Sequence, residues 1–155
     1  MALRREGTAP QEESSARGVG RLILELAREM RTAFERELTP LGITGQQAEL
    51  IYRTHRAGTI TPNELTRLLL TDNAGVTRLL DRLEAKRLIA RRAHPDDRRS
   101  VHVALTASGR ALIPRLRRVA EAQQRRLLRE MSAPEEARLH QLLERVLANV
   151  REGPA

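Results

Sequence analysis

Residues 61–106 constrain the fold most, because two closely spaced helix starts are followed there by an arginine-rich hairpin. Thr61, Pro62 and Glu64 are typical of a helix N-terminus, with a capping threonine, proline at the first helical position and glutamate at the third. Asp72 can cap a second helix, and the short segment before it has room only for a tight turn. Two compact helices and a two-stranded hairpin make the outline of a winged helix–turn–helix, which can lay a helix in the DNA major groove.

The second helix of this pair and the hairpin show the periodicities that this outline requires. The helix carries one apolar stripe, which comprises Val76, Leu79, Leu80 and Leu83. Strands are expected at 88–93 and 101–105, the second because apolar and polar residues alternate along it. Thr106 can then cap a long helix. The outward face of the second helix and the tip of the hairpin are therefore the candidate DNA-binding surfaces.

Helices are also expected on both sides of this lobe. Apolar residues at three- and four-residue steps predict one helix over 20–39 and two more within 107–152. Thr44 opens a helix at the start of the lobe through a T-x-x-Q capping box, and a further capping box begins at Ser132. The expected fold class is therefore mainly α with a small β component (α+β), with a winged helix–turn–helix lobe at 44–106 and helical extensions at both ends.

The helices outside the lobe each carry an apolar stripe, and a lobe of this size cannot cover all of them. We expect them to pack against the same helices of a second copy, which would make the protein a homodimer. A monomer whose terminal helices fold back over the lobe is the alternative. Residues 1–17 are polar, mix both charges and are expected to form a disordered tail, which leaves 18–155 as a single domain.

The charge balance indicates a polyanionic partner. The net charge is +8, and all of the 28 basic residues except Lys86 are arginine. Charge alone does not distinguish nucleic acid from a membrane surface. The first residues, however, lack the apolar run of a signal peptide, and no stretch reaches the ~20 apolar residues needed to span a bilayer. We therefore expect a cytoplasmic protein without a membrane partner.

Several chemistries are excluded or disfavoured by the residues present. The chain has no cysteine, which excludes disulfides, thiolate metal sites and a cysteine-based redox switch. The four histidines lack metal-ligand spacing and lie far apart, at His55, His94, His102 and His140. The sequence shows neither a Gly-rich phosphate loop nor a nucleophile elbow. We expect neither an enzyme nor a protein that holds a metal or a cofactor.

Two blocks of sequence, in this order and spacing, resemble the MarR family of bacterial transcriptional regulators. The blocks are Val76-Thr77-Arg78 followed by Leu79-Leu80-Asp81-Arg82-Leu83-Glu84, and Asp97-Arg98-Arg99 with Val101, Val103 and the Leu105-Thr106 step. The resemblance spans the chain from about Leu22 to Val150. It implies a dimer with two winged lobes and a dimerisation region built from both chain ends, at 20–39 and 107–152. It also implies a palindromic operator and, often, relief by a small aromatic or anionic effector.

One residue departs from the pattern of this family. Arg87 stands directly after the expected recognition helix, where the family usually has glycine. Glycine accepts the left-handed conformation that ends a helix, whereas arginine adopts it at a cost of roughly 1 kcal/mol or ends the helix differently. The placement of the hairpin depends on which of these two outcomes occurs.

The outward face of the second helix carries the residues expected to read DNA. Asn73, Thr77 and Arg78 are candidates for base contacts, since asparagine can pair bidentately with adenine and arginine with guanine. Ala74 and Gly75 allow close approach, and Ala74 can touch a thymine methyl group. On an isolated helix, a merely solvated face would be the better interpretation. The capped helix before it and the basic hairpin after it favour base contact.

The tip of the hairpin is expected to supply positive charge. The resemblance implies that Arg99 enters the minor groove and that Asp97 orients it by a charge-assisted hydrogen bond. Arg98 is expected to contact phosphate, and Arg82 to contact phosphate or to pair within its own helix. Six basic residues stand against two acidic ones across 86–99, an excess that a turn needed only for solubility would not show.

A candidate effector pocket involves the first two helices, which border the effector cleft in the family that the chain resembles. Its members are Phe34, Tyr52, Arg53, His55 and Arg56. Together they could hold a carboxylated aromatic molecule. The alternative is that the two aromatic residues belong to the core and the cations to the surface.

The function expected from these residues is sequence-specific binding of duplex DNA by a transcriptional regulator. We take it to be a repressor that a small-molecule effector releases. The alternative is an architectural protein that binds DNA with little sequence preference and has no effector. A ratio near one between binding to a preferred site and binding to random duplex would favour the alternative.

Overall fold

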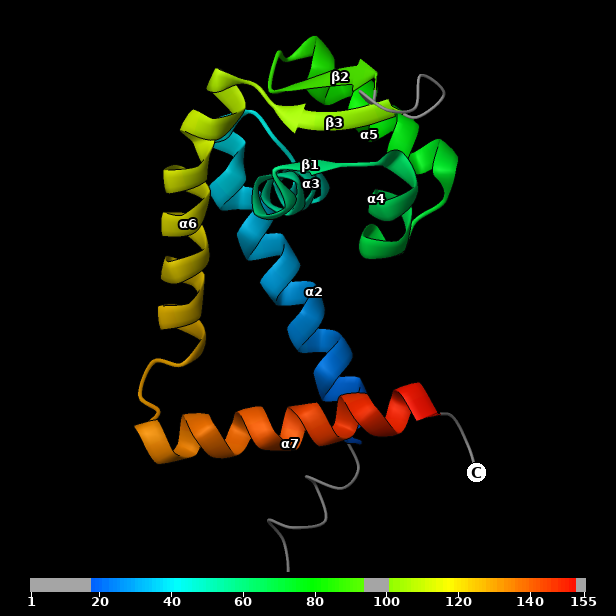
Figure 1. Ribbon diagram of the computed structural model, residues 1–155. Coiled ribbons are helices and arrows are strands. Elements are labelled where there is room, and N and C mark those ends of the chain that lie inside the picture. Colours follow the sequence, from blue (N-terminus) through cyan, green and yellow to red (C-terminus); the bar gives the residue numbers. More distant parts are fainter. Residues whose placement is uncertain (1–17, 94–100, 153–155) are drawn as a thin grey trace, which may run out of the picture. The chain divides into compact units, whose positions relative to one another are not determined.

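The computed structural model describes residues 18–93 and 101–152 (Figure 1). In chain order its elements are α2 (Val19–Leu38), the 3-10 turn η1 (Thr39–Leu41), α3 (Gly45–Ala57), β1 (Thr59–Ile60), α4 (Pro62–Leu69), α5 (Asn73–Ala85), β2 (Ile89–Ala93), β3 (Val101–Leu105), α6 (Ala107–Leu127) and α7 (Ala133–Glu152). The expected fold class, mainly α with a small β component, is confirmed. The tail predicted at 1–17 lies outside the described residues.

The chain divides into two compact units. The first ends at Val119 and the second begins at Ala120, so that α6 contributes to both. In the part of the chain that the structure describes, no helix is both long and apolar enough to cross a membrane.

The sheet of the first unit has three antiparallel strands in the order β1–β3–β2. The two hairpin strands begin within a residue of their expected positions, and Ile89 of β2 lies opposite Leu105 of β3. The sequence pattern does not predict β1, because two residues are too few to show an alternation. Gly58, at φ 76°, turns the chain from α3 into β1, where Ile60 pairs with Val103. The short strand thus ties the middle of the lobe to the hairpin.

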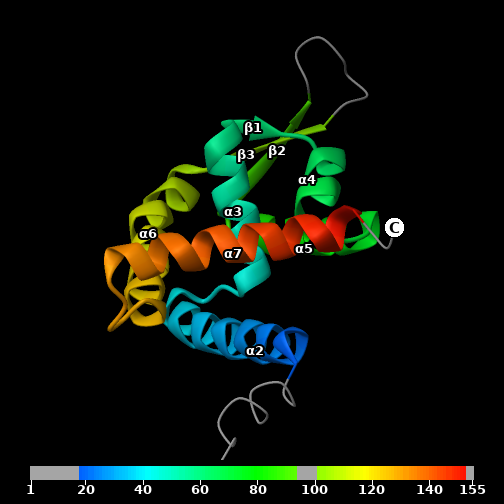
Figure 2. The ribbon, with the colours of Figure 1, turned by 90° about the horizontal axis from the view of Figure 1, so that it is seen from below.

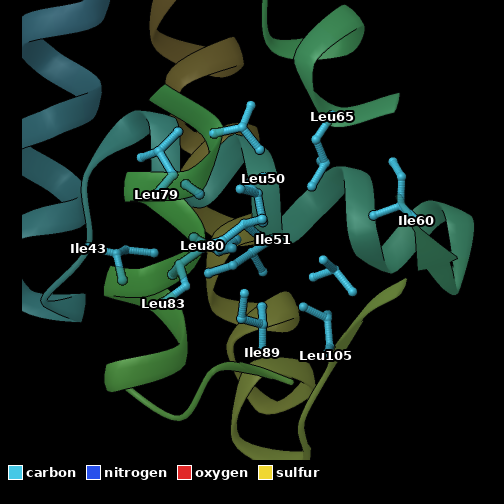
Figure 3. Packing of buried hydrophobic residues seen from close by; sticks show 14 of the residues in the cluster. Ile43, Leu50, Ile51, Ile60, Leu65, Leu79, Leu80, Leu83, Ile89 and Leu105 are labelled. Atoms are coloured by element: carbon cyan, nitrogen blue, oxygen red, sulfur yellow. The ribbon is translucent and has the colours of Figure 1, made fainter. Parts of the chain in front are cut away.

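The core of the first unit lies between α3, α5 and the sheet. The four residues of the predicted stripe on α5 are all buried: Val76, Leu79, Leu80 and Leu83. Figure 3 shows Leu80 beside Ile51 of α3, with Ile89 of β2 below them. Figure 2 shows α4 beside α3, which it contacts. Because burial of one such leucine or isoleucine side chain contributes roughly 1.5–3 kcal/mol, this cluster is the main source of stability in the lobe.

Side-chain caps begin the helices of the lobe as the sequence predicts. Thr44 and Gln47 form a complete capping box on α3, and Thr61 and Glu64 form one on α4. Asp72 Oδ1 accepts a hydrogen bond of 2.6 Å from the backbone N–H of the third residue of α5. These caps satisfy backbone donors that a helix leaves unpaired, and they determine where α4 and α5 begin.

The caps of the two long helices differ from each other. Thr106 Oγ1 accepts a 3.0 Å hydrogen bond from the Gly109 N–H, which confirms the predicted cap of α6. At α7, the Ser132 N–H donates to Glu135 Oε2 at 2.8 Å, but the Ser132 hydroxyl donates to the same oxygen at 2.6 Å. Of the two hydrogen bonds of the predicted capping box, the one accepted by Glu135 is therefore formed, while the Ser132 hydroxyl bonds to Glu135 and not to the helix backbone. The side-chain and backbone hydrogen bonds from Ser132 lower the pKa of the Glu135 carboxyl.

Arg87 ends α5 in the left-handed conformation, at φ 56°. Its N–H donates to the Glu84 carbonyl at 2.8 Å, and the Leu88 N–H donates to the Leu83 carbonyl at 2.9 Å, which is the Schellman pattern. Arginine thus adopts the geometry that glycine would provide. The Thr106 hydroxyl donates to the Arg87 carbonyl at 2.7 Å, so that the end of α5 is anchored to the end of β3.

Apolar side chains of α2 and of the second unit are exposed in the single chain. No residue of α7, which the structure describes from end to end, is buried. The exposed fraction is 63% at Leu22 in α2 and 43% at Leu143 in α7. Within the second unit, an apolar cavity of about 590 Å³ is lined by Leu127 of α6 and Leu139 and Leu143 of α7. The chain alone leaves these stripes uncovered.

Candidate nucleic-acid interface

The first turns of α5 bring the predicted base-reading residues to the surface. Four of them are exposed: Asn73, Ala74, Thr77 and Arg78. Gly75 is half-buried, and a Cβ atom there would lie 2.6 Å from Thr71 Oγ1 and 2.8 Å from Asp72 Oδ1. A larger residue here would therefore require the Thr71 or the capping Asp72 side chain to shift, a constraint separate from the close approach to DNA that we predicted for Gly75.

The hydrogen bonds of this face decide which groups remain available to DNA. Thr77 Oγ1 donates to the Asn73 carbonyl at 2.8 Å, so that its proton is used within the helix although the residue is exposed. Arg78 and Arg82 are exposed, and neither forms an ion pair with another residue in the described ranges. Of the two possibilities considered for Arg82, this arrangement favours contact with a phosphate.

Arg91 of β2 joins the hairpin to α5. Its Nη2 lies 2.7 Å from Asp81 Oδ1, and its Nη1 lies 3.2 Å from Glu84 Oε2. Nη2 also donates to the Thr77 carbonyl at 3.4 Å, and Glu84 accepts a 3.3 Å bond from the Arg91 backbone N–H. Because the guanidinium group spans successive turns of α5, it fixes the angle between this helix and β2. This link was not predicted from the sequence, although two acidic residues three apart on a helix before a basic strand are a usable signal.

Lys86, the single lysine of the chain, connects the end of α5 to the start of α3. Its ammonium group donates to Gln47 Oε1 at 2.9 Å and to the carbonyl of Gly42. Gln47 is buried and also receives the Thr44 N–H at 3.3 Å. Lys86 thus links two elements within the lobe as well as adding to the positive charge of residues 86–99.

The predicted contacts at the hairpin tip lie outside the described residues. These are Asp97, Arg98 and Arg99, whose roles remain predictions. The strands that flank the tip end opposite each other, with Ala93 paired to Val101. On β2, Arg92 is exposed and directly follows the half-buried Arg91.

A cavity of about 360 Å³ lies between α2, α3 and the turn from α4 to α5. Its apolar wall includes Phe34, Leu69 and Leu79. Its charged groups are Arg31, Glu35 and Glu49. Because Leu69 ends α4 and Leu79 belongs to α5, a molecule in this cavity would touch the helix pair that presents the candidate DNA-reading residues.

The five predicted effector residues do not meet at this cavity. Phe34 lines it and packs against the core, whereas Tyr52, Arg53, His55 and Arg56 are exposed on α3. Arg53 Nε is paired with Glu49 Oε1 at 2.7 Å. Tyr52 is 41% exposed, so that the interpretation of both aromatic residues as core residues fits Phe34 alone.

No cluster of three or more metal-ligating side chains occurs within residues 18–93 and 101–152. The described histidines lie on different elements, His55 on α3, His102 on β3 and His140 on α7. With its capped helix pair and its clamped hairpin, the lobe has the features of a DNA-binding winged helix–turn–helix.

The comparisons with known proteins agree with this class. The model of the MarR family matches residues 41–100. The multiple antibiotic resistance protein MarR of Salmonella typhimurium LT2 is 35% identical over 130 residues, which cover 83% of this chain and 90% of that protein. The chain therefore belongs to the MarR family of transcriptional regulators, and the resemblance seen in the sequence is confirmed.

Solved structures show the same likeness. The structure of a mutant of E. coli MarR complexed with operator DNA has a TM-score of 0.75 and 34% identity, and the match covers 83% of this chain and 93% of that one. The structure of Bordetella bronchiseptica BpsR, described as a mechanism for regulation of DNA binding by 6-hydroxynicotinic acid, has a TM-score of 0.72 and 25% identity, with 83% and 97% covered.

Proposed function

We propose that this protein is a homodimeric repressor that binds a palindromic operator through α5 and is released by a small-molecule effector. The observation that carries the proposal is the pairing of an exposed reading face on α5 with a buried stripe on its opposite side. Arg91 holds that helix to the hairpin at 2.7 Å from Asp81. A lobe built in this way presents one helix face at a fixed angle, as entry into a major groove requires.

Contacts to DNA divide between the helix and the hairpin. Asn73, Thr77 and Arg78 read base edges, and Ala74 allows the backbone of α5 to approach. Arg82 and Arg98 neutralise phosphates. Arg99 enters the minor groove, oriented by Asp97. The proposal is supported by the exposure of the four helix residues and by the availability of the Arg78 and Arg82 guanidinium groups.

The homodimer is supported by the apolar stripes that the single chain leaves exposed on α2 and α7. Residues 20–39 and 107–152 are proposed to form the dimerisation region. A second copy would cover these stripes and set two recognition helices on a two-fold axis. Such a dimer reads half-sites one helical turn apart, roughly 10 base pairs centre to centre.

The effector response is proposed to act through the cavity between α2, α3 and the α4–α5 turn. Its walls belong on one side to α2 and α3 and on the other to the helix pair that reads DNA. A ligand that fits the cavity only when α5 is displaced would bind that state more tightly than the DNA-binding state. It would therefore lower operator affinity by the difference between its two binding free energies. The exposed cations Arg53, His55 and Arg56 remain a second candidate site for an anionic molecule.

No catalytic role is proposed, since the homologues are transcriptional regulators and the argued contacts account for the exposed polar groups of α5. The architectural alternative is not favoured by the family to which the chain belongs. A regulator of chromosomal operators acts in the cytoplasm, and that is the compartment we propose.

The experiment is selection of duplex fragments from the protein's own genome, followed by sequencing. The proposal predicts a two-fold symmetric motif whose half-sites lie roughly 10 base pairs apart. Fragments without a shared motif would support the architectural alternative. The genes beside the selected sites then suggest effectors, which are tested for release of the protein from its operator.

A further inference from the structure

A hydrogen-bond arrangement at the α4–α5 turn bears on which base Asn73 reads. Thr66 Oγ1 lies 3.0 Å from the Pro62 carbonyl oxygen of its own helix and 2.8 Å from Asn73 Oδ1 at the start of α5. Thr66 is half-buried and Asn73 is exposed. The Asn73 amide, which we propose to read DNA, is therefore in hydrogen-bond contact with Thr66 of the preceding helix α4.

A proton count decides how these groups are bonded. A hydroxyl group carries one proton, whereas the Pro62 carbonyl and Asn73 Oδ1 are both acceptors. A half-turn of the amide about its Cβ–Cγ bond puts Nδ2 in the place of Oδ1. Nδ2 can then donate to Thr66 Oγ1 while Oγ1 donates to the Pro62 carbonyl, as threonine commonly does four residues along a helix. This arrangement forms two hydrogen bonds in place of one.

We propose that Thr66 is a specificity-determining residue that holds the Asn73 amide in the orientation that pairs with adenine. The inference rests on the proposed function, in which α5 enters the major groove. In the relay from Nδ2 through Oγ1 to the Pro62 carbonyl, one amide proton of Asn73 is used. The other amide proton and Oδ1 face away from Thr66. They form the edge that matches adenine, which offers an acceptor at N7 and a donor at N6.

The opposite orientation of the amide would read a different base. If Thr66 donated to Oδ1, one lone pair of that oxygen would be used, and Nδ2 with its two protons would be the amide group farthest from Thr66. Guanine offers two acceptors in the major groove, N7 and O6, whereas adenine offers one acceptor and one donor. The preference for adenine or guanine at this position therefore reports the orientation of the amide.

Thr66 also acts before DNA binds. A side-chain amide without such a partner turns between both orientations, and binding must then select one of them, which lowers affinity. The relay removes this freedom in advance. Loss of the Thr66 hydroxyl is therefore expected to relax base preference at one position and to leave phosphate contacts unchanged, because Thr66 is uncharged and half-buried.

The test uses the full-length protein and a duplex site selected from random sequence. The position read by Asn73 is identified as the symmetric pair at which Asn73→Ala loses its preference. Affinities for sites carrying adenine or guanine at that pair are then measured for the wild type, Thr66→Val and Thr66→Ser. Valine keeps the shape of threonine without its hydroxyl group, and serine keeps the hydroxyl group. Affinity for random duplex shows that each variant is folded, and Thr66→Ala serves as a second hydroxyl-free variant.

The wild type is expected to prefer adenine by about ten-fold per half-site, a preference that Thr66→Ser retains. Thr66→Val and Thr66→Ala are expected to bind the two sites within about two-fold of each other, with unchanged affinity for random duplex. A wild-type preference for guanine would overturn the proposed orientation. Full adenine preference in both hydroxyl-free variants would overturn the role of Thr66 and leave the proposed function intact. No effect of Asn73→Ala would overturn the role of Thr66 and would also remove Asn73 from the proposed base contacts. A wild type that selects no sequence would overturn both.

Discussion

Helices α5 and α7 carry apolar stripes of similar spacing, but the chain covers only one of them. The stripe of α5 is buried, with Leu83 fully enclosed, whereas α7 exposes Leu142 and Leu143 by 41% and 43%. α5 is followed within a few residues by strands that close over it. α7 has no such element after it in the described chain. The periodicity of a helix therefore shows that a stripe needs a partner, and the neighbouring elements show whether the same chain supplies one.

The polar faces of the two helices differ as well. On α5, Asp81 and Glu84 are joined to Arg91 of the hairpin, which fixes the helix against another element. On α7, the pair of His140 and Glu144 stays within the helix, at 3.6 Å. The first arrangement suits a recognition helix, whose angle to the hairpin must stay fixed. The second suits a helix whose position is set by its apolar face.

The largest expected effect is loss of the dimer in Leu143→Asp. A charge in the exposed stripe of α7 would have to be buried against the second copy without a partner. Light scattering should show a monomer mass, and operator affinity should fall by roughly 100-fold or more, because each lobe then binds alone. The control is Gln141→Asp, which adds the same charge to the same helix outside the stripe. A dimer that persists in Leu143→Asp would remove α7 from the interface.

Leu80→Ala tests the covered stripe. Leu80 is 2% exposed, and truncation of a buried leucine lowers the free energy of unfolding by roughly 2–5 kcal/mol. Denaturant unfolding measures this loss, and light scattering should still show the dimer mass. A loss below about 1 kcal/mol would mean that the lobe does not depend on this contact.

Arg91→Ala tests the link between α5 and the hairpin. Loss of its bonds to Asp81 and Glu84 frees the helix to change its angle, and operator affinity should fall by about ten-fold. Binding titrations measure this effect on the selected site and on random duplex. Arg91→Lys is the control for charge, since it keeps the cation but cannot span both carboxylates. If lysine restored full affinity, charge would matter and the clamp would not.

Arg87→Gly should stabilise the protein by roughly 1 kcal/mol, because glycine adopts the left-handed conformation that arginine holds at φ 56° without a steric penalty. Thermal or denaturant unfolding measures the gain. In the matched control, Arg118→Gly within α6, glycine replaces arginine in a helical conformation and should destabilise by roughly 1 kcal/mol. Equal signs for the two substitutions would contradict the account of the α5 terminus.

The smallest expected effect is on acid stability. Backbone and side-chain hydrogen bonds from Thr61 lower the pKa of the Glu64 carboxyl. A carboxyl with a lowered pKa in the folded state stabilises the fold above its unfolded pKa and loses this contribution as the pH falls through the folded value. In Glu64→Gln, stability should therefore fall less steeply as the pH drops below about 4. Thermal unfolding at several pH values measures this dependence. Glu152→Gln at the end of α7 is the control, and identical pH profiles for both variants would argue against the capping carboxylate.

Most of the fold of the lobe could be predicted from its sequence. Thr44, Thr61, Asp72 and Thr106 all cap helices where expected, because capping depends on residues only three apart. β1 could not be predicted, since a two-residue strand is defined by its pairing with β3. The Ser132 hydroxyl was assigned to the helix backbone but donates to Glu135, a local competition that the sequence does not decide.

The exposed face of α5 could be predicted from the sequence, but the hydrogen bonds and ion pairs that join α5 to other elements could not. Asn73, Thr77 and Arg78 are exposed because the stripe of α5 leaves them outside. The bonds of Arg91 and Lys86 join residues from different elements, so that helical spacing alone does not reveal them. The effector residues show the same limit: they share helices, yet four of the five do not line the cavity that Phe34 lines.

The ratio of affinities for a selected operator and for random duplex of equal length, at one salt concentration, tests the central claim most directly. Sequence reading by α5 predicts a wild-type ratio of at least roughly 1,000, which Arg78→Ala lowers by about ten-fold per half-site while its affinity for random duplex stays nearly unchanged. Arg98→Ala should weaken binding to both duplexes alike and leave the ratio as it was. A wild-type ratio near one, or an equal loss on both duplexes in Arg78→Ala, would contradict the claim that α5 reads sequence.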